Sequence, residues 1–250
     1  MLIHGWGLSY TIWQKLVPLL EPHFQLILVE LPGMGNTELR AANKPYYETC
    51  AEALEELRLS LGIEQWAILS YSIGTRTSEI YLRDYPERVT RALFLCPNFL
   101  LKSWQICLHI VNWLNLKNVQ LANWFFSDWR LFGILQFLAF NFRKTDDARL
   151  WMDEIELQSL ENLKNMLLEL PDKGRSPFNL PETSQVPTLF VWGLQDLLTA
   201  RPFRPRPNDV FIPGNHAAPL YVPESIASIA VAFFQEEQAV YKSPYLILTD

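Results

Sequence analysis

The sequence has few cysteines, no excess of basic residues and no long apolar run. Each of these features argues against a class of protein. Cys50, Cys96 and Cys107 are odd in number and form no CxxC pair in a chain of 250 residues. This argues against a disulfide framework and a cysteine-rich metal site, and it favours a reducing compartment. The net charge of -6 argues against a general nucleic-acid-binding surface.

The apolar residues are not gathered into one long stretch. No run reaches the roughly 18 residues of a spanning helix, and the amino terminus lacks the basic segment and apolar run of a signal peptide. We therefore expect a soluble, cytoplasmic protein without a membrane span.

Apolar residues nevertheless make up 49% of the chain, enough for one globular domain with room for an inserted subdomain. Short β-rich runs alternate with longer helical patterns, which predicts an α/β fold with a mostly parallel sheet flanked by helices. The expected strands are 24–31, 66–71, 92–97, 187–193 and 209–214, and the expected helices are 47–62, 75–89 and 223–240.

Residues 98–180 interrupt this alternation, because they are helical in pattern, dense in Trp, Phe and Leu, and contain no convincing strand. We interpret them as an inserted helical cap between a first part of the core, 1–97, and a second part, 181–250. The apolar faces of the cap either pack only on each other and on the sheet, or also line a pocket for an apolar substrate. The two interpretations are compatible.

The beginning of the chain is short for this kind of fold. A strand or two are expected before the loop "HGWG", but only Met1, Leu2 and Ile3 precede it. Two explanations stay open: the native start lies upstream, or the first hairpin of the sheet is absent and an edge is exposed.

The pentapeptide "SYSIG" places Ser72 directly after an apolar strand and before a predicted helix. A sharp strand-to-helix turn exposes its central residue as a nucleophile, and small flanking residues let the turn close. The usual pattern is GxSxG, and Ser70 replaces the first glycine here. Taken alone, Ser72 is either such a nucleophile or an ordinary serine that caps the helix.

A serine hydroxyl needs a base within hydrogen-bond reach and a carboxylate that orients the base. Asp196 follows the expected strand 187–193, and His216 follows the expected strand 209–214 in a Gly/Asn loop. Singly, these are a turn aspartate and a loop histidine. Together, at strand ends and in the chain order Ser, Asp, His, they predict a catalytic triad.

Acyl transfer also needs backbone N–H donors aimed at the oxygen that gains charge. The small residues of "IHGWG" allow the main chain to approach that oxygen, and we expect the N–H groups of Trp6 and Ile73 to form this oxyanion hole. His4 is interpreted as a residue that fixes the loop by hydrogen bonds rather than as a second base.

The motifs "HGWG", "LVELPGMGNT", "SYSIG", "WGLQD" and "GNHAAPLYVPE" resemble, in this order, the landmarks of the α/β-hydrolase fold family. Residues 4–35 are especially similar to the carboxylesterases that cleave pimeloyl-acyl-carrier-protein methyl ester in biotin synthesis. The chain departs from the family pattern at Glu30, Thr37 and Thr75, where Asp, Ser and Gly are usual.

The resemblance implies further roles in the cap. Phe137 and Phe140 would line an alkyl-chain channel and Asn141 would bond a polar atom of the substrate, although packing alone also explains them. Basic side chains in 143–149 (Arg143, Lys144 and Arg149) would dock an acidic acyl carrier protein, although Asp146 and Asp147 dilute the charge and an ordinary solvated helix start explains them as well.

The resemblance implies a serine carboxylesterase with a small-molecule ester substrate, acyl carrier protein as a partner, and neither a metal nor an organic cofactor. A general esterase, a thioesterase or a carbon–carbon bond hydrolase of the same fold is the second reading. A receptor that binds a small apolar ligand without turning it over is the third.

Overall fold

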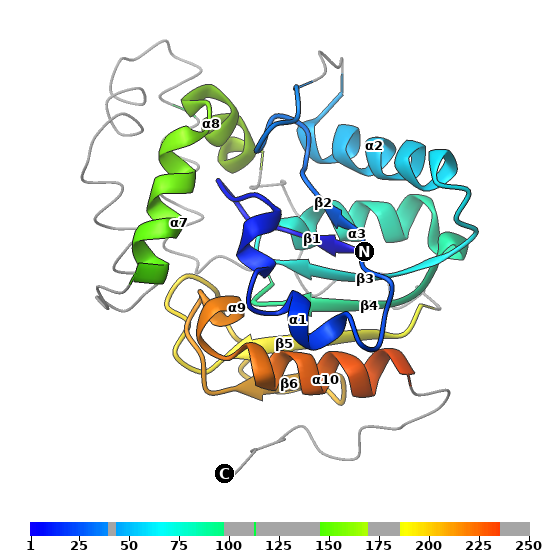
Figure 1. Ribbon diagram of the computed structural model, residues 1–250, viewed down its shortest axis with the longest axis vertical. Coiled ribbons are helices and arrows are strands. Elements are labelled where there is room, and N and C mark those ends of the chain that lie inside the picture. The colour runs from blue at the N-terminus through cyan, green and yellow to red at the C-terminus, as the bar shows by residue number, and fades with distance from the viewer. Residues whose placement is uncertain (40–43, 98–112, 114–145, 170–185, 236–250) are drawn as a thin grey trace.

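The computed structural model describes residues 1–39, 44–97, 113, 146–169 and 186–235 (Figure 1). Six parallel strands form one sheet in the order β2-β1-β3-β4-β5-β6. The strands are β1 (Leu2–Ile3), β2 (Leu28–Val29), β3 (Trp66–Tyr71), β4 (Val89–Leu95), β5 (Thr188–Gly193) and β6 (Asp209–Ile212). The predicted α/β fold class is therefore confirmed.

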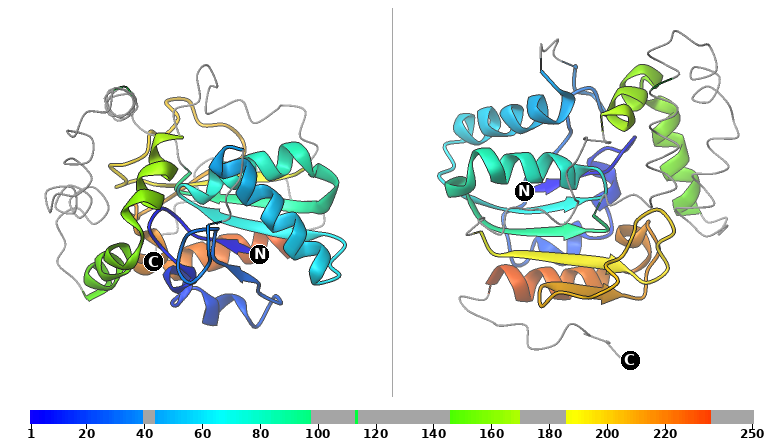
Figure 2. Two further views of the ribbon diagram at one scale, coloured as in Figure 1. Left: turned by 90° about the horizontal axis from the view of Figure 1, so that it is seen from above. Right: turned by 180° about the vertical axis from the view of Figure 1, so that it is seen from behind.

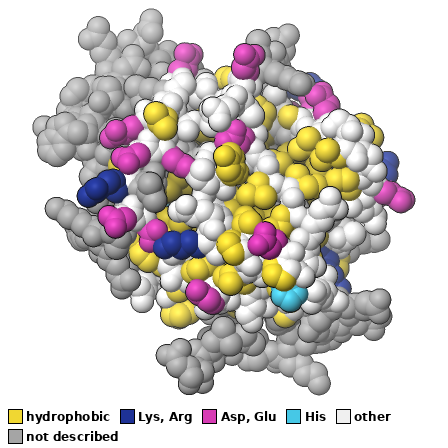
Figure 3. Space-filling view, in the orientation of Figure 1, with side chains coloured by type: hydrophobic (Ala, Val, Ile, Leu, Met, Phe, Trp, Pro, Cys, Tyr) yellow, Lys and Arg dark blue, Asp and Glu magenta, His cyan; other side chains and the backbone are white. Residues whose placement is uncertain are grey.

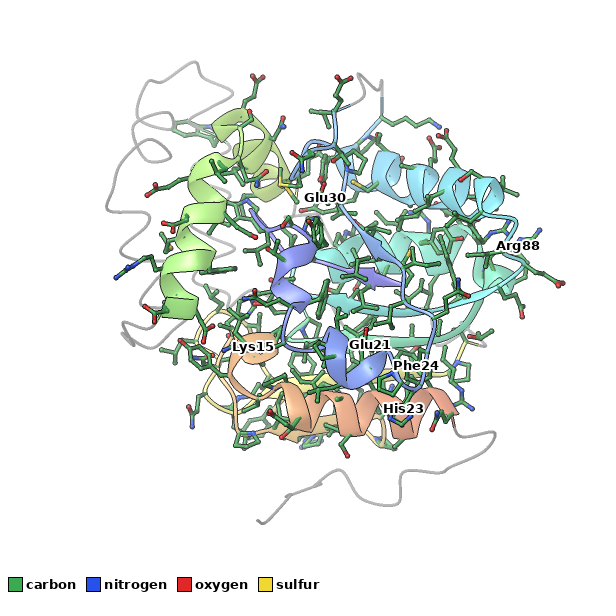
Figure 4. All side chains as sticks on the ribbon, in the orientation of Figure 1. Lys15, Glu21, His23, Phe24, Glu30 and Arg88 are labelled. Carbon is green, nitrogen blue, oxygen red and sulfur yellow. The ribbon has the colours of Figure 1, made fainter. Side chains whose placement is uncertain are left out.

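Helices cover both faces of this sheet. Helices α1 (Val17–Leu20) and α10 (Pro223–Gln235) pack together on one face, and α2 (Tyr46–Ser60) and α3 (Gly74–Asp84) pack together on the other (Figures 1 and 2). Phe24, which is labelled in Figure 4, joins the end of α1 to α10 by an edge contact with Phe234, with ring centroids 6.0 Å apart. The remaining short elements are η1 (Tyr10–Trp13), η2 (Pro86–Arg88) and α9 (Ala218–Tyr221).

The core strands are buried on both faces, as a sheet with two helical layers requires. Five of the six residues in each of β3 and β5 are buried, and Leu93, Phe94 and Leu95 of β4 are completely enclosed. The ring of Phe94 meets that of Phe190 edge-on across β4 and β5. Near-continuous apolar runs in the sequence thus correspond to central strands.

Strand β1 was not among the expected strands, because two residues carry no readable pattern. Leu2 pairs with Leu28 of β2 on one side and with Leu69 of β3 on the other, so β1 lies inside the sheet. The expected strand 24–31 is only two residues long in the structure. The expected helix 75–89 ends at Asp84, because Pro86 follows and disfavours helical backbone in the residue before it.

Helices α7 (Asp146–Leu157) and α8 (Leu160–Leu168) lie beyond the carboxyl ends of the strands (Figure 1). They belong to the segment interpreted as a cap, whose boundaries at 98 and 180 fall outside the described residues and stay a prediction. Within the described part of the chain, no helix combines the length and hydropathy that crossing a bilayer needs.

A buried carboxylate fastens the segment before β6 to the sheet. Asp209 is fully enclosed and accepts hydrogen bonds from the indole Nε1 of Trp192 at 2.8 Å and from the backbone N of Arg206 at 2.7 Å. The Arg206 guanidinium pairs with the same carboxylate at 2.9 Å and lies 4.2 Å from the centre of the Phe190 ring.

Replacement of Asp209 by alanine should lower the free energy of unfolding by about 2–3 kcal/mol, because buried donors lose their acceptor. Urea denaturation measures the change. Asp153→Ala is the matched control, since Asp153 is exposed and should cost less than about 0.5 kcal/mol. Equal stability of the two variants would contradict the fastening role of Asp209.

Candidate active site

Ser72 occupies the turn between β3 and α3 in a strained conformation. Its φ of 51° lies in the left-handed region that residues with a side chain rarely adopt. The turn is held because Ser72 N donates to Leu95 O at 3.0 Å, while Thr75 donates to Ser72 O from its backbone N at 3.0 Å and from its hydroxyl at 2.6 Å. The Ser72 side chain thereby stands at the carboxyl edge of the sheet and remains partly accessible.

The structure brings the three predicted triad residues together. Ser72 Oγ lies 2.8 Å from His216 Nε2, and His216 Nδ1 lies 2.8 Å from Asp196 Oδ2. Each residue follows a different strand, β3, β5 or β6, and parallel strands place these ends at one edge. His216 and Asp196 are buried, with 4% and 6% of their surface exposed.

Four donors surround the Asp196 carboxylate. Leu198 N and Thr199 N donate to Oδ1 at 2.8 and 3.2 Å, and Thr199 Oγ1 donates to Oδ2 at 2.8 Å, beside His216. Burial alone would raise the pKa of Asp196, but the charge of His216 and these hydrogen bonds outweigh it, so the pKa is lowered. Asp196 is thus held as a carboxylate that accepts from the imidazole.

Three neighbours position His216 and Asp196, and sequence reasoning missed all of them. The Tyr71 hydroxyl donates to His216 O at 2.7 Å, and its ring lies 5.3 Å from the imidazole centre. Gly193 lets the two loops meet, since a Cβ there would stand 2.6 Å from Gly214 O. Thr199 is the third, and the spacing Asp-x-x-Thr was the one local signal that pointed to it.

Two glycines bring the "HGWG" loop against the turn of Ser72. A Cβ on Gly74 would stand 2.3 Å from His4 O, and one on Gly5 would stand 3.1 Å from Ser72 Cβ. The backbone N–H groups of Trp6 and Ile73 flank this contact, and neither donates to an acceptor within the described residues. These two donors belong to the residues that directly follow Gly5 and Ser72 in the chain.

His4 carries two hydrogen bonds that fix its loop. Its Nδ1 lies 2.8 Å from Gly5 O, and its Nε2 accepts from Leu31 N at 3.0 Å. The ring is completely buried, and burial lowers its pKa to about 4 despite the bond to Gly5 O. Neutral His4 thus joins the loop to the segment after β2.

Helices α7 and α8 are hydrogen-bonded to the first loop and to helix α2 of the core. Trp6 Nε1 donates to Leu163 O at 2.8 Å, and Tyr47 OH donates to Met166 O at 2.6 Å. Ser9 donates to the Glu154 carboxylate from both its backbone N and its hydroxyl at 3.2 Å. The side chain of Trp6 is therefore fixed by a hydrogen bond to helix α8.

The cap residues predicted to touch the substrate, Phe137, Phe140 and Asn141, lie outside the described residues, as do Arg143 and Lys144. Arg149 is described and is exposed on α7.

One cluster of metal-ligand side chains occurs in the described part of the chain, and it is the site itself. Potential ligand atoms of Cys96, Asp196 and His216 lie within 4.8 Å of one another. Burial and the nearby Asp196 charge raise the pKa of the Cys96 thiol well above its ordinary value, so it is a poor metal ligand. Asp196 and His216 are also bonded to each other, so the arrangement fits a proton relay better than a metal centre.

The model of the family described as "alpha/beta hydrolase fold" matches residues 1–213. The chain belongs to this family. Solved structures agree in fold: a thermophilic esterase from Thermogutta terrifontis superposes with a TM-score of 0.75 at 17% identity, covering 94% of this chain and 88% of that one. A hydrolase from Oleispira antarctica gives a TM-score of 0.73 at 16% identity, covering 94% and 90%.

Sequence relatives share shorter segments with this hydrolase-fold chain. A "Pimeloyl-[acyl-carrier protein] methyl ester esterase" of Yersinia enterocolitica is 34% identical over 90 residues, 36% of this chain and 32% of that protein. The enzyme of the same name from Legionella pneumophila is 32% identical over 95 residues, 34% of this chain and 40% of that protein. The chain thus spans 32% to 40% of the length of these relatives.

The buried His4 predicts how the stability of the protein depends on pH. The unfolded chain binds a proton near pH 6.5 whereas the folded chain does so only near pH 4, so the stability contributed by neutral His4 is lost as the pH falls through this window. The loss should amount to roughly 3 kcal/mol. Urea denaturation from pH 7 to pH 4 should therefore show a weaker pH dependence in His4→Gln than in the unsubstituted protein.

His23→Gln is the control, because His23 is exposed and lies outside the site. It should keep the pH dependence of the unsubstituted protein. Identical pH dependence in His4→Gln and the unsubstituted protein would show that His4 is not buried in its neutral form.

Proposed function

We propose that the protein is a serine carboxylesterase in which Ser72 is the nucleophile, His216 the general base and Asp196 the residue that orients the base. The observation that carries this proposal is the chain of two 2.8 Å hydrogen bonds, from Ser72 Oγ to His216 Nε2 and from His216 Nδ1 to Asp196 Oδ2. Hydroxyl, imidazole and carboxylate in this order make a hydroxyl reactive near neutral pH.

The reaction proceeds through an acyl-enzyme. His216 Nε2 takes the proton from Ser72 Oγ as the oxygen attacks the ester carbonyl carbon. The imidazolium then gives this proton to the departing alcohol, and an ester bond to Ser72 remains. Water repeats the sequence: it loses a proton to His216, attacks the acyl carbon and releases the acid with the Ser72 hydroxyl restored.

The N–H groups of Trp6 and Ile73 are proposed to bind the oxyanion. Ile73 directly follows Ser72, Trp6 directly follows Gly5, which lies against the Ser72 side chain, and neither N–H has an acceptor within the described residues. Ile73 also precedes α3, and the partial positive charge at a helix amino terminus favours a developing anion. Because the Trp6 indole is hydrogen-bonded to Leu163 O, the backbone N–H of Trp6 is held in place before the substrate arrives.

For the substrate, we propose the methyl ester of a medium-chain acyl group carried on acyl carrier protein. The names of the relatives from Yersinia enterocolitica and Legionella pneumophila support this class. Phe137, Phe140 and Asn141 are proposed to line the acyl channel. No metal or organic cofactor takes part in the proposed steps.

Ser72→Ala should lower kcat on a short p-nitrophenyl ester by about 10⁶-fold, as loss of the nucleophile does in other triad enzymes. Ser70→Ala is the matched control. Ser70 lies two residues away, is buried, and its hydroxyl has no hydrogen-bond partner in the described part of the chain. It should keep kcat within a few-fold, and both variants should keep the far-ultraviolet circular dichroism of a folded protein. Undiminished turnover by Ser72→Ala would end the proposal.

The substrate assignment is tested with a methyl pimeloyl group on acyl carrier protein. The protein should release methanol from this substrate and should restore growth without biotin to a strain that lacks its methyl ester esterase. Hydrolysis of p-nitrophenyl esters without either result would support a general esterase. Tight binding of an apolar ligand with no turnover of any ester would support the receptor.

A further inference from the structure

The segment between Asp196 and Asp209 presents a basic, apolar loop beside the site. Residues 200–205, which we name the arginine loop, carry Arg201, Phe203 and Arg204, all exposed. Phe203 is 97% exposed, which is unusual for a large aromatic residue because it leaves apolar surface in contact with water. Neither arginine pairs with a carboxylate among the described residues, although the whole chain has a net charge of -6.

Both ends of the arginine loop are fastened to buried carboxylates. Before the loop, Leu198 N and both donors of Thr199 bind the Asp196 carboxylate. After it, Arg206 binds Asp209 through its backbone and its guanidinium. Pro202 and Pro205 further restrict the backbone between these points, so the loop displays its exposed side chains at little entropic cost to a partner.

The loop lies at the rim of the site. It begins directly after Thr199, which binds the Asp196 carboxylate, and Figures 1 and 2 place the β5–β6 connection at the carboxyl edge of the sheet, beside the amino-terminal end of α7. A macromolecule docked on this loop would sit next to the entrance rather than on the far side of the sheet.

The described surface of the cap has the opposite charge. Exposed carboxylates follow α7 and α8, and Figure 3 shows acidic side chains gathered over these helices: Asp146, Asp153, Glu156 and Glu161. Arg149 is the one exposed cation of described α7. Lys15 is engaged by Asp147 at 2.7 Å and by Leu220 O at 3.2 Å, between α7 and α9 (Figure 4). An acidic partner would be repelled from α7 and attracted to the arginine loop.

We propose that the arginine loop is the docking surface for the acidic carrier protein that delivers the ester to Ser72. This inference rests on the proposed function. Arg201 and Arg204 would pair with carboxylates of the carrier, and Phe203 would be buried at the centre of the contact, since aromatic residues and arginine are the side chains that protein interfaces favour. The location differs from the patch in residues 143–149 that the sequence predicted.

The test compares one acyl chain in two forms, as the methyl ester on acyl carrier protein and as a free small methyl ester. The double variant R201E/R204E should lower kcat/KM on the carrier-borne ester roughly tenfold or more, mainly through KM, by removing electrostatic attraction. It should leave kcat/KM on the free ester within about twofold, because no reacting group is changed.

The unsubstituted protein should turn over the carrier-borne ester more slowly as the salt concentration is raised, and the double variant should lose this dependence on salt. Phe203→Ser should also weaken only the carrier reaction.

Two charge reversals serve as controls. Lys44→Glu changes an exposed cation that pairs with Glu52 at the beginning of α2, and Arg149→Glu changes the cation of the acidic cap. Both should leave the carrier reaction nearly unchanged. A loss with Arg149→Glu but not with R201E/R204E, or an equal loss with Lys44→Glu, would overturn the proposal, as would an equal loss on the free ester.

Failure of the docking proposal is distinguishable from failure of the proposed function. Turnover of the free ester with carrier turnover unaffected by the loop variants overturns the docking surface alone. Lack of turnover of either ester by the unsubstituted protein overturns the proposed function on which it rests.

Discussion

The backbone of Ser72 stands at a φ of 51°, and the positions of the other groups in the site depend on this turn. It aims the hydroxyl away from the sheet toward His216 and begins α3 immediately afterwards. The strain is opposed by hydrogen bonds from Ser72 N to β4 and from Thr75 to Ser72 O. The same turn allows Gly5 and Gly74 to bring the first loop within contact distance, so the proposed nucleophile and the proposed oxyanion donors depend on the same turn.

The site also depends on the burial of its polar side chains. Asp196, His216 and His4 are almost completely removed from solvent, yet each has its partners. In this environment an imidazole keeps its tautomer because Asp196 accepts from Nδ1, which leaves Nε2 for Ser72. His4 serves the opposite purpose: burial keeps it neutral, and it holds a loop without titrating near neutral pH. His216 and His4 thus have different roles in the fold because their hydrogen-bond partners differ.

The sequence predicted those features of the site that short motifs specify, and it missed those that depend on contacts between distant parts of the chain. The turn of Ser72 and the strand ends before Asp196 and His216 were readable, because parallel strands bring their carboxyl ends to one edge. Strand β1 was missed because its two residues are defined by partners on both sides. The bonds from Tyr71 to His216 and from Trp6 to Leu163 were missed for a related reason: they join residues more than 100 positions apart. The importance of Thr199 was recognisable only once Asp196 was placed.

We expect His216 to activate the hydroxyl of Ser72 and no other hydroxyl of the chain. The most direct measurement is mass-spectrometric mapping of the adduct formed with a fluorophosphonate, which phosphonylates activated serines. One adduct per chain is expected, on the peptide that contains Ser72, and no adduct is expected in His216→Ala. An adduct at another residue, or none on the folded unsubstituted protein, would contradict this expectation.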